Sequence, residues 1–292
     1  MRIGSVREVW RYPVKSMMGE RVGAAAVTRI GLVGDRGWAC RDEVRGGIRG
    51  AKKIGGLMRL AARYDSEPTP TSPSPPVTIT LPDGSTTHSG APDVADRVSA
   101  AVDHPVTLWP LQPPEDLDHY RRGPGDTDDI VAELRDIFGR DEQEPLPDLT
   151  VFPPEIVEFE SRPGTYYDAY PIHLLTDASL RTLERSLPGS VLDVRRFRPN
   201  LVVALDGQNS GGAPFPEAGW IGRRLRIGAG EYDVVAPCPR CVMPTRDFDD
   251  LPADREILHT IVREADQNLG VYLVPAGDDG RLAEGDDVAL LA

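Results

Sequence analysis

Short apolar runs with the alternation of β-strands recur along most of this chain, and turn residues separate them. The first, residues 6–12, ends at Pro13, and the run at 77–81 leads into a Pro-Asp-Gly turn at residues 82–84. Further runs of this kind lie at 24–30, 38–40, 106–109, 172–175, 201–205, 219–227, 232–236, 271–274 and 287–291. Many short strands with few helices predict an α+β, mainly β fold built on barrels or closed sheets.

Helical patterns are fewer, and each has recognisable ends. We expect helices over residues 93–102, from Asp126 or Thr127 as N-cap to Gly139, over 176–187, and over 255–265. The second of these carries its apolar side chains on one face, which indicates packing against the rest of the protein. That face holds Ile130, Val131, Leu134, Ile137 and Phe138.

Composition divides the chain into three parts. Residues 1–110 are mostly strand-like, residues 111–160 are rich in proline and acidic residues and hold one helix, and residues 161–292 alternate strands with helices. We interpret the middle part as a connector that packs its helix onto the body. A plain tether and the border of a substrate opening are the two alternatives for it.

Net charge and cysteine usage limit the partners. The chain holds 46 acidic and 33 basic residues, and its net charge of −13 disfavours nucleic acid and anionic membrane surfaces. No apolar run approaches the roughly 18 residues of a membrane-spanning helix. Three cysteines form no even disulfide framework and are typical of a reducing compartment. We therefore expect a cytoplasmic protein with no nucleic-acid or membrane partner.

Two of the three cysteines, Cys238 and Cys241, lie within four residues, and prolines flank them at 237, 239 and 244. Proline fixes φ, so a thiol between prolines has its direction largely set before a ligand binds. Arg240 and Arg246 lie close in sequence, and positive charge favours the thiolate that binds metals or attacks electrophiles. The pattern indicates a metal ligand or a nucleophile at Cys241.

Three other interpretations of this Cys-x-x-Cys stretch stay open. Structural zinc needs four ligands, yet Cys40 is the only other thiol and no two histidines have the spacing of a zinc pair. A thioredoxin-like redox pair starts a helix after a strand, whereas these prolines favour an extended loop. A buried, inert pair is the third interpretation.

Only three of the 33 basic residues are lysines: Lys15, Lys52 and Lys53. A chain with so strong a preference for arginine keeps a lysine either by chance or because a site requires it. Lysine is a compact point charge on a flexible stem, and it suits a single anionic oxygen better than the planar fork of arginine does.

Four segments offer anion-binding groups near the expected end of a strand. Lys15 and Ser16 follow the first strand, and Arg36 lies between two glycines that allow close approach. The other candidates are Thr176 and Ser179 at a helix N-terminus, and Arg198 and Asn200 before a buried strand. Together these groups would hold a phosphorylated cofactor whose metal Cys241 ligates. Singly, each is more simply explained as a solvated charge, a turn salt bridge, a helix cap or a structural ion pair.

The order of these motifs points to a known family. Tyr-Pro-Val-Lys-Ser, Gly-Asp-Arg, Leu-Leu-Thr-Asp-Ala-Ser-Leu, Arg-Phe-Arg-Pro-Asn and Cys-x-Arg-Cys follow one another along the sequence. With them the chain resembles the MOSC-domain proteins that carry an N-terminal MOSC β-barrel domain, a group that includes the amidoxime-reducing components. The resemblance covers nearly the whole chain except about residues 111–160.

The resemblance implies an N-terminal MOSC β-barrel domain over residues 1–110, a MOSC β-barrel domain with peripheral helices over 161–292, and a molybdenum cofactor. The pyranopterin of that cofactor, molybdopterin, binds molybdenum through a dithiolene, and a soft thiolate suits such a sulfur-rich centre. By motif, the protein ligand to molybdenum is Cys241, and Cys238 is its neighbour. Cofactor contacts are implied at Lys15, Ser16, Arg36, Thr176, Ser179, Arg198 and Asn200.

The activity implied is the reduction of N-hydroxylated compounds such as amidoximes, hydroxylamines and N-hydroxylated bases. The alternative is a carrier of molybdenum cofactor or of sulfur without turnover. Cys40 alone cannot hold an iron–sulfur cluster, and no Gly-x-Gly-x-x-Gly follows a strand, so we expect a separate flavin or iron–sulfur protein as electron donor. The family's Thr-Thr-Val-Asp-Pro-like run after the cysteine is replaced here by residues 243–247, so we expect a different substrate preference.

Overall fold

The computed structural model describes residues 1–207 and 212–291. A closed barrel of seven strands lies at its centre, and the barrel closes where β1 pairs with β11. Neighbouring strands are antiparallel except β10 and β11, which are parallel. In order around the barrel the strands are β11 (Leu201–Leu205), β10 (Ile172–Thr176), β14 (Asn268–Pro275), β13 (Gly230–Pro239), β12 (Arg224–Ile227), β16 (Asp287–Leu290) and β1 (Arg2–Arg11).

The barrel interior is apolar because alternate residues of its strands face inward. Along β13, every second residue from Tyr232 to Cys238 is buried. Val6 and Val9 of β1 join the same core as Leu201 of β11. The other six strands of the barrel come from residues 172–290, and β1 completes it. The first residues of the chain therefore pack with its C-terminal half.

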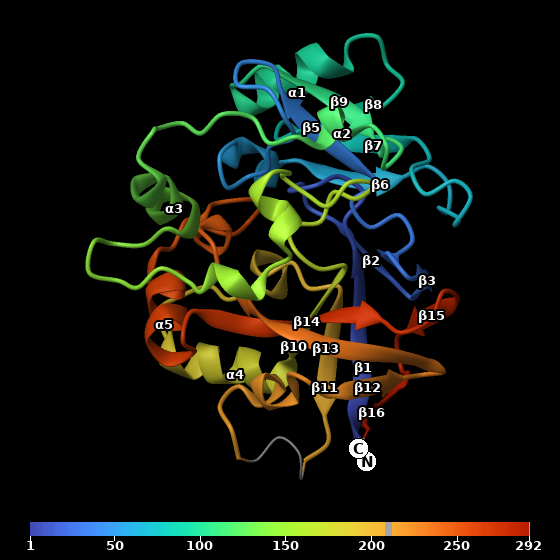
Figure 1. The fold of residues 1–292 in the computed structure, drawn as a ribbon, viewed down its shortest axis with the longest axis vertical. Helices are drawn as coiled ribbons and strands as arrows, with labels where there is room; N and C mark the ends of the chain where they lie inside the picture. Colours follow the sequence, from blue (N-terminus) through green and yellow to red (C-terminus); the bar gives the residue numbers. More distant parts are fainter. Residues whose placement is uncertain (208–211, 292) are drawn as a thin grey trace.

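Three small sheets surround the barrel, and two of them form the upper part of the molecule in Figure 1. Those two are β5 (Trp38–Asp42) with β9 (Val106–Pro110), and β6 (Ala61–Tyr64), β7 (Val77–Thr80) and β8 (Thr86–His88). The third holds β15 (Gly280–Ala283), β3 (Ala24–Thr28) and β4 (Gly31–Leu32), and β2 (Glu20–Val22) extends β1. The mainly β, α+β class predicted from the sequence is confirmed.

Two helices cover one side of the barrel, α4 (Asp177–Ser186) and α5 (Glu256–Glu264). Leu180 and Leu183 of α4 pack with Ile257 and Ile261 of α5 in one core cluster. The remaining helices are α1 (Val94–Val102), α2 (Leu117–Tyr120) and α3 (Ile130–Phe138). The 3-10 turns are η1 (Gly55–Arg59), η2 (Leu149–Val151), η3 (Pro154–Val157), η4 (Val194–Arg196), η5 (Pro216–Trp220) and η6 (Met243–Thr245).

The segment after Cys241 packs into the N-terminal half. Met243, Phe248 and Leu251 share a core cluster with Leu57 and Met58 of η1. Hydrophobic burial therefore fixes the cysteine segment against residues from early in the chain. The division of the chain at residues 110 and 160 stays a prediction.

The connector helix differs from its predicted form. Its N-cap is Asp129, whose carboxylate accepts the N–H groups of Val131 and Ala132 at 2.9 and 3.1 Å, not Asp126 or Thr127. Asp126 instead pairs with Arg49 and Lys53. Gly139 ends the helix at φ 59°, as predicted.

The predicted apolar face of α3 is only partly covered. Ile130 and Val131 are 73% and 53% exposed, and only Phe138 of the helix is buried. The connector also holds the short helix α2, where one helix was expected. In Figure 1 α3 lies at the edge of the molecule, between the upper sheets and α5.

Candidate functional site

Lys15 lies in the turn after β1, and its side chain is 4% exposed. Its Nζ donates to Asp168 Oδ1 at 2.6 Å and to the Tyr166 carbonyl at 2.8 Å. Lys52 Nζ lies 3.0 Å from Asp168 Oδ2. Two of the three lysines of the chain therefore hold one carboxylate, and Lys15 cannot be a solvated surface charge.

Burial and the charges of Lys15, Lys52 and Asp168 shift the pKa values of all three groups. Burial alone would raise the pKa of Asp168, but the two ammonium groups hold it well below its usual range. Burial lowers the pKa of Lys15 despite the attraction of Asp168. Burial also opposes the charge of Lys52, yet Asp168 and the sulfur of Cys241 outweigh it and raise the pKa of that lysine. Because the Asp168 side chain is 41% exposed, this carboxylate is accessible from solvent.

A second cluster places two guanidinium groups against the ring of Tyr12. The Cζ atoms of Arg198 and Arg36 lie 4.2 and 5.1 Å from the ring centroid. The Tyr12 hydroxyl donates to the Pro199 carbonyl at 3.0 Å, which fixes the ring. Burial lowers the pKa of Arg198 to about 10, and Asp168 opposes that shift. Asp168 thus couples this arginine cluster to the lysine pair.

Arg198 has hydrogen-bonding capacity that the protein leaves unused. Its Nη1 donates to the Met17 carbonyl at 2.5 Å, whereas its Nη2 is buried without a hydrogen-bond partner among the described residues. A buried donor without an acceptor costs about 1–3 kcal/mol, so such a group is typical of a ligand site. The donor set suits an anionic oxygen.

Three of the predicted cofactor residues have backbones in the left-handed region. The φ angles of Ser16, Arg36 and Arg198 are 70°, 53° and 54°. Non-glycine residues seldom adopt this conformation, and it concentrates at functional sites. Ser16 Oγ also accepts the N–H of Ala51 at 2.9 Å, which holds the turn containing Lys52 against the turn containing Lys15.

Cys238 occupies the last part of β13, not an extended loop. It is 2% exposed, and Arg240 Nη1 donates to its Sγ at 3.0 Å. Pro237 and Pro239 fit into the strand because this end of β13 pairs only with β14, and a register shift falls between them. The prediction of a loop was wrong here.

Cys241 follows the strand directly and is half-buried. Positive groups surround it, since its sulfur influences the pKa values of Lys52, Arg140 and Arg240. For Arg240, burial lowers the pKa, but Cys238 and Cys241 outweigh it and the net pKa is raised. A half-buried sulfur among cations is accessible to a metal ion or an electrophile.

Comparisons with known proteins show the family of this chain. Residues 3–111 match the MOSC N-terminal beta barrel domain, and residues 161–289 match the MOSC domain. The chain is a MOSC protein with an N-terminal β-barrel domain.

Relatives of this MOSC protein include mitochondrial amidoxime reducing component 2 of Bos taurus, 26% identical over 87% of this chain and 70% of the relative. Mitochondrial amidoxime-reducing component 1 of Homo sapiens is 27% identical over 99% of this chain and 84% of its own length. Among solved structures, the YUAD protein from Bacillus subtilis is similar with a TM-score of 0.41 at 9% identity, covering 99% of this chain and 94% of that one. No helix among the described residues is long and apolar enough to cross a membrane.

Thr176 and Ser179 of the MOSC protein already hold a carboxyl group of the protein itself. Both side chains are fully buried, and their hydroxyls donate to Glu217 Oε2 at 2.7 and 2.6 Å. Thr176 also caps α4 by accepting the Ser179 N–H at 3.1 Å. The sequence indicated an anion at this helix N-terminus, and within the described structure Glu217 takes that place. A cofactor contact at these two residues stays a prediction.

Asn200 is likewise engaged within the barrel. Its Oδ1 accepts the His173 N–H at 3.1 Å, and its Nδ2 donates to the Trp10 carbonyl at 3.3 Å. The Asn200 side chain therefore links the start of β11 to β1 and to β10. Arg198, two residues before Asn200, donates to the Met17 carbonyl and lies over the Tyr12 ring. This short segment therefore contributes one side chain to the barrel and one to the cationic site.

Sequence reasoning missed Lys52, Asp168 and Arg240 as parts of this site. The scarcity of lysine could have pointed to Lys52, because the argument that a site requires a lysine applies equally to all three lysines. Asp168 carries no local signal, because its partners Lys15 and Lys52 lie far away in sequence. Arg240 was considered only for its charge, whereas the structure shows it bonded to Cys238 and to the Phe197 carbonyl.

Proposed function

We propose that this MOSC protein is a molybdenum-cofactor oxidoreductase that reduces N-hydroxylated compounds such as amidoximes and hydroxylamines. The observation that carries the proposal is a half-buried thiol, Cys241, beside a buried cationic cluster with an unused donor on Arg198. The names of the relatives, amidoxime reducing components, support the choice of substrate class.

The residues fit the cofactor in two respects. Cys241 offers a sulfur ligand to molybdenum, and thiolates suit sulfur-rich metal centres. Lys15, Arg36 and Arg198 offer buried or half-buried positive charge, with the free Nη2 of Arg198 directed to an acceptor that the protein does not supply. When bound, the cofactor supplies the two-electron redox chemistry, while the protein binds and orients it.

Side chains of the protein would bind the substrate in this proposal. Lys15 and Lys52 fix both oxygens of Asp168, which stays ionised and accessible. Such a carboxylate accepts hydrogen bonds from the N–H and N–OH groups of an amidoxime. Lys52 keeps its proton because its pKa is raised, so a positive charge remains next to Cys241 throughout turnover.

Electrons come, in this proposal, from a separate flavin or iron–sulfur protein. Burial raises the pKa of Cys40 to about 12, so this thiol is suited to packing and not to ligation. With Cys238 bound to Arg240 and Cys241 assigned to molybdenum, the chain has no set of four cysteines for a cluster.

The test uses protein made in a host that synthesises molybdenum cofactor. We expect conversion of benzamidoxime to benzamidine with a chemical reductant or an added donor protein, and none with NADH or NADPH alone. Cys241→Ser should lose this activity, and Cys238→Ser should retain most of it. Molybdenum bound without turnover under any donor would contradict the reductase and support a cofactor carrier.

A further inference from the structure

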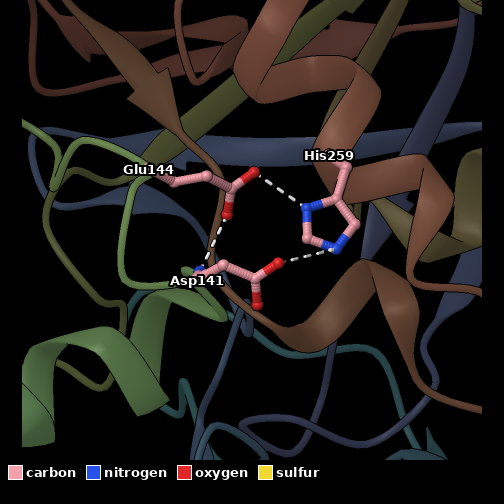
Figure 2. A group of neighbouring side chains, drawn as sticks. All are labelled: Asp141, Glu144 and His259. Carbon is pink, nitrogen blue, oxygen red and sulfur yellow. Dashed lines mark hydrogen bonds and ion pairs between the residues drawn. The ribbon is translucent and has the colours of Figure 1, made fainter.

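A group of three potential metal ligands lies between the connector and α5, outside the site described above. Figure 2 shows Asp141 and Glu144, which follow α3, facing His259 of α5. His259 Nδ1 lies 2.8 Å from Glu144 Oε1, and His259 Nε2 lies 3.9 Å from Asp141 Oδ2. One ligand atom from each residue lies within 4.8 Å of the other two.

We propose that Asp141, Glu144 and His259 form a binding site for a divalent transition-metal ion, with Zn²⁺ as the best match. One imidazole nitrogen and two carboxylates are a donor set that zinc accepts in proteins. In a tetrahedral zinc site with bonds of about 2.1 Å the ligand atoms lie about 3.4 Å apart, so rotation of these partly exposed side chains has to close the set around the ion. The ion replaces the proton that His259 shares with Glu144.

The surroundings keep the ligands ready for a cation. His259 and the Asp141 N–H both face the carboxylate of Glu144. The same N–H donates to Glu144 Oε2 at 2.9 Å and orients it. Arg255, 3.3 Å from Asp141, is 72% exposed and free to turn away. Two further cations lie near the site, and both are directed to other acceptors: Arg140 to backbone carbonyls and Gln267, and Arg135 to the backbone carbonyls of Asp141 and Glu144.

A metal here would join the connector to the cysteine segment. Arg140 Nη2 donates to the Arg240 carbonyl at 3.0 Å, and the Val242 N–H donates to the Ile137 carbonyl at 3.1 Å. The residues on both sides of Cys241 are therefore bonded to the stretch that carries Asp141. That stretch lies between the two family matches, which end at residue 111 and resume at 161, whereas His259 lies within the second match.

The test is a calorimetric titration of Zn²⁺ into the full-length protein after treatment with EDTA and desalting. We expect one Zn²⁺ per chain at this site. His259→Asn should weaken its binding by at least about 10-fold, since even residues outside a metal's ligand shell change affinity by about 10- to 100-fold. Glu144→Gln should weaken it similarly, which gives a second variant if His259→Asn folds poorly.

Two matched controls separate this site from others. His88 faces a single carboxylate, with its Nδ1 3.5 Å from Asp65, so His88→Asn should bind Zn²⁺ as the unmodified protein does. Cys241→Ser should also retain this binding, because no thiol belongs to the site. Absence of Zn²⁺ binding, or binding that survives both His259→Asn and Glu144→Gln, would overturn the proposal. Loss in Cys241→Ser alone would place the zinc at the cysteines and overturn it as well.

Discussion

Replacing Glu217 by glutamine tests whether the N-terminus of α4 holds a carboxyl group of the protein itself. Glu217 is 1% exposed, and its Oε2 accepts hydrogen bonds from Thr176 and Ser179. Its Oε1 is buried without a partner. Burial raises the pKa of Glu217 although the two hydroxyls oppose the shift.

The sign of the pH dependence follows from this raised pKa. The folded protein binds the Glu217 proton more tightly than the unfolded chain does, so this contribution to stability is complete below the ordinary glutamate pKa of about 4.3. This contribution to stability declines as the pH rises from the ordinary glutamate pKa to the raised pKa of Glu217 in the folded protein. The loss is about 1.4 kcal/mol for each pH unit between these two pKa values. Glu217→Gln keeps an oxygen for both hydroxyls and removes the ionisation. From pH 4.5 to 8 it should gain stability relative to the unmodified protein, by about 1.4 kcal/mol for each unit by which the pKa of Glu217 is raised.

The assay is urea unfolding of both proteins from pH 4.5 to 8. We expect the difference in unfolding free energy to grow in favour of Glu217→Gln as the pH rises. Glu142 is exposed, and Glu142→Gln should show no such trend. A difference that does not change with pH, or a glutamine variant that is less stable at pH 8, would refute the reasoning. It would mean that Thr176 and Ser179 stabilise a charged group at this position.

Two further predictions concern the lysines and arginines. Lys15→Ala and Arg36→Ala should each weaken cofactor retention by about 1.5–3 kcal/mol for a lost charge-assisted bond, measured as molybdenum content after dialysis; unchanged content in both would contradict their proposed role. Lys53 pairs with carboxylates of α3 and the residues before it, Asp126, Glu133 and Asp136, at 3.1, 2.9 and 2.9 Å. Lys53→Met should speed limited proteolysis within residues 111–160 while costing about 1 kcal/mol or less of stability, because these pairs are partly exposed; cleavage elsewhere first would count against it.

The sequence predicted correctly those structural elements that are determined by residues close together in the chain. The Thr176 cap, the buried leucines of α4 and the turn at residues 82–84 all depend on neighbours within four residues, and each is present. The strand expected at 219–227 begins only at Arg224, because residues 216–220 form η5. The short strands β2, β4, β6, β8 and β15 were missed, since runs of two to four residues become strands only through pairing.

The charged site shows the same limit more sharply. Lys15, Arg36, Arg198 and Cys241 were selected because their motifs are contiguous in sequence. Asp168 could not be found that way, because its role depends on two lysines that the fold brings to it. Similarly, nothing around residue 217 indicates that its carboxylate lies over the start of α4, since Thr176 and Glu217 are 41 positions apart in sequence.

The central claim is that Cys241 holds a molybdenum cofactor with which the buried cations make contact. Its most direct test is the molybdenum-to-protein ratio of the unmodified chain, Cys238→Ser and Cys241→Ser, each purified from a host able to make the cofactor. We predict close to one molybdenum per chain in the first two proteins and almost none in Cys241→Ser. Equal loss in both cysteine variants, or no molybdenum in the unmodified protein, would contradict the account.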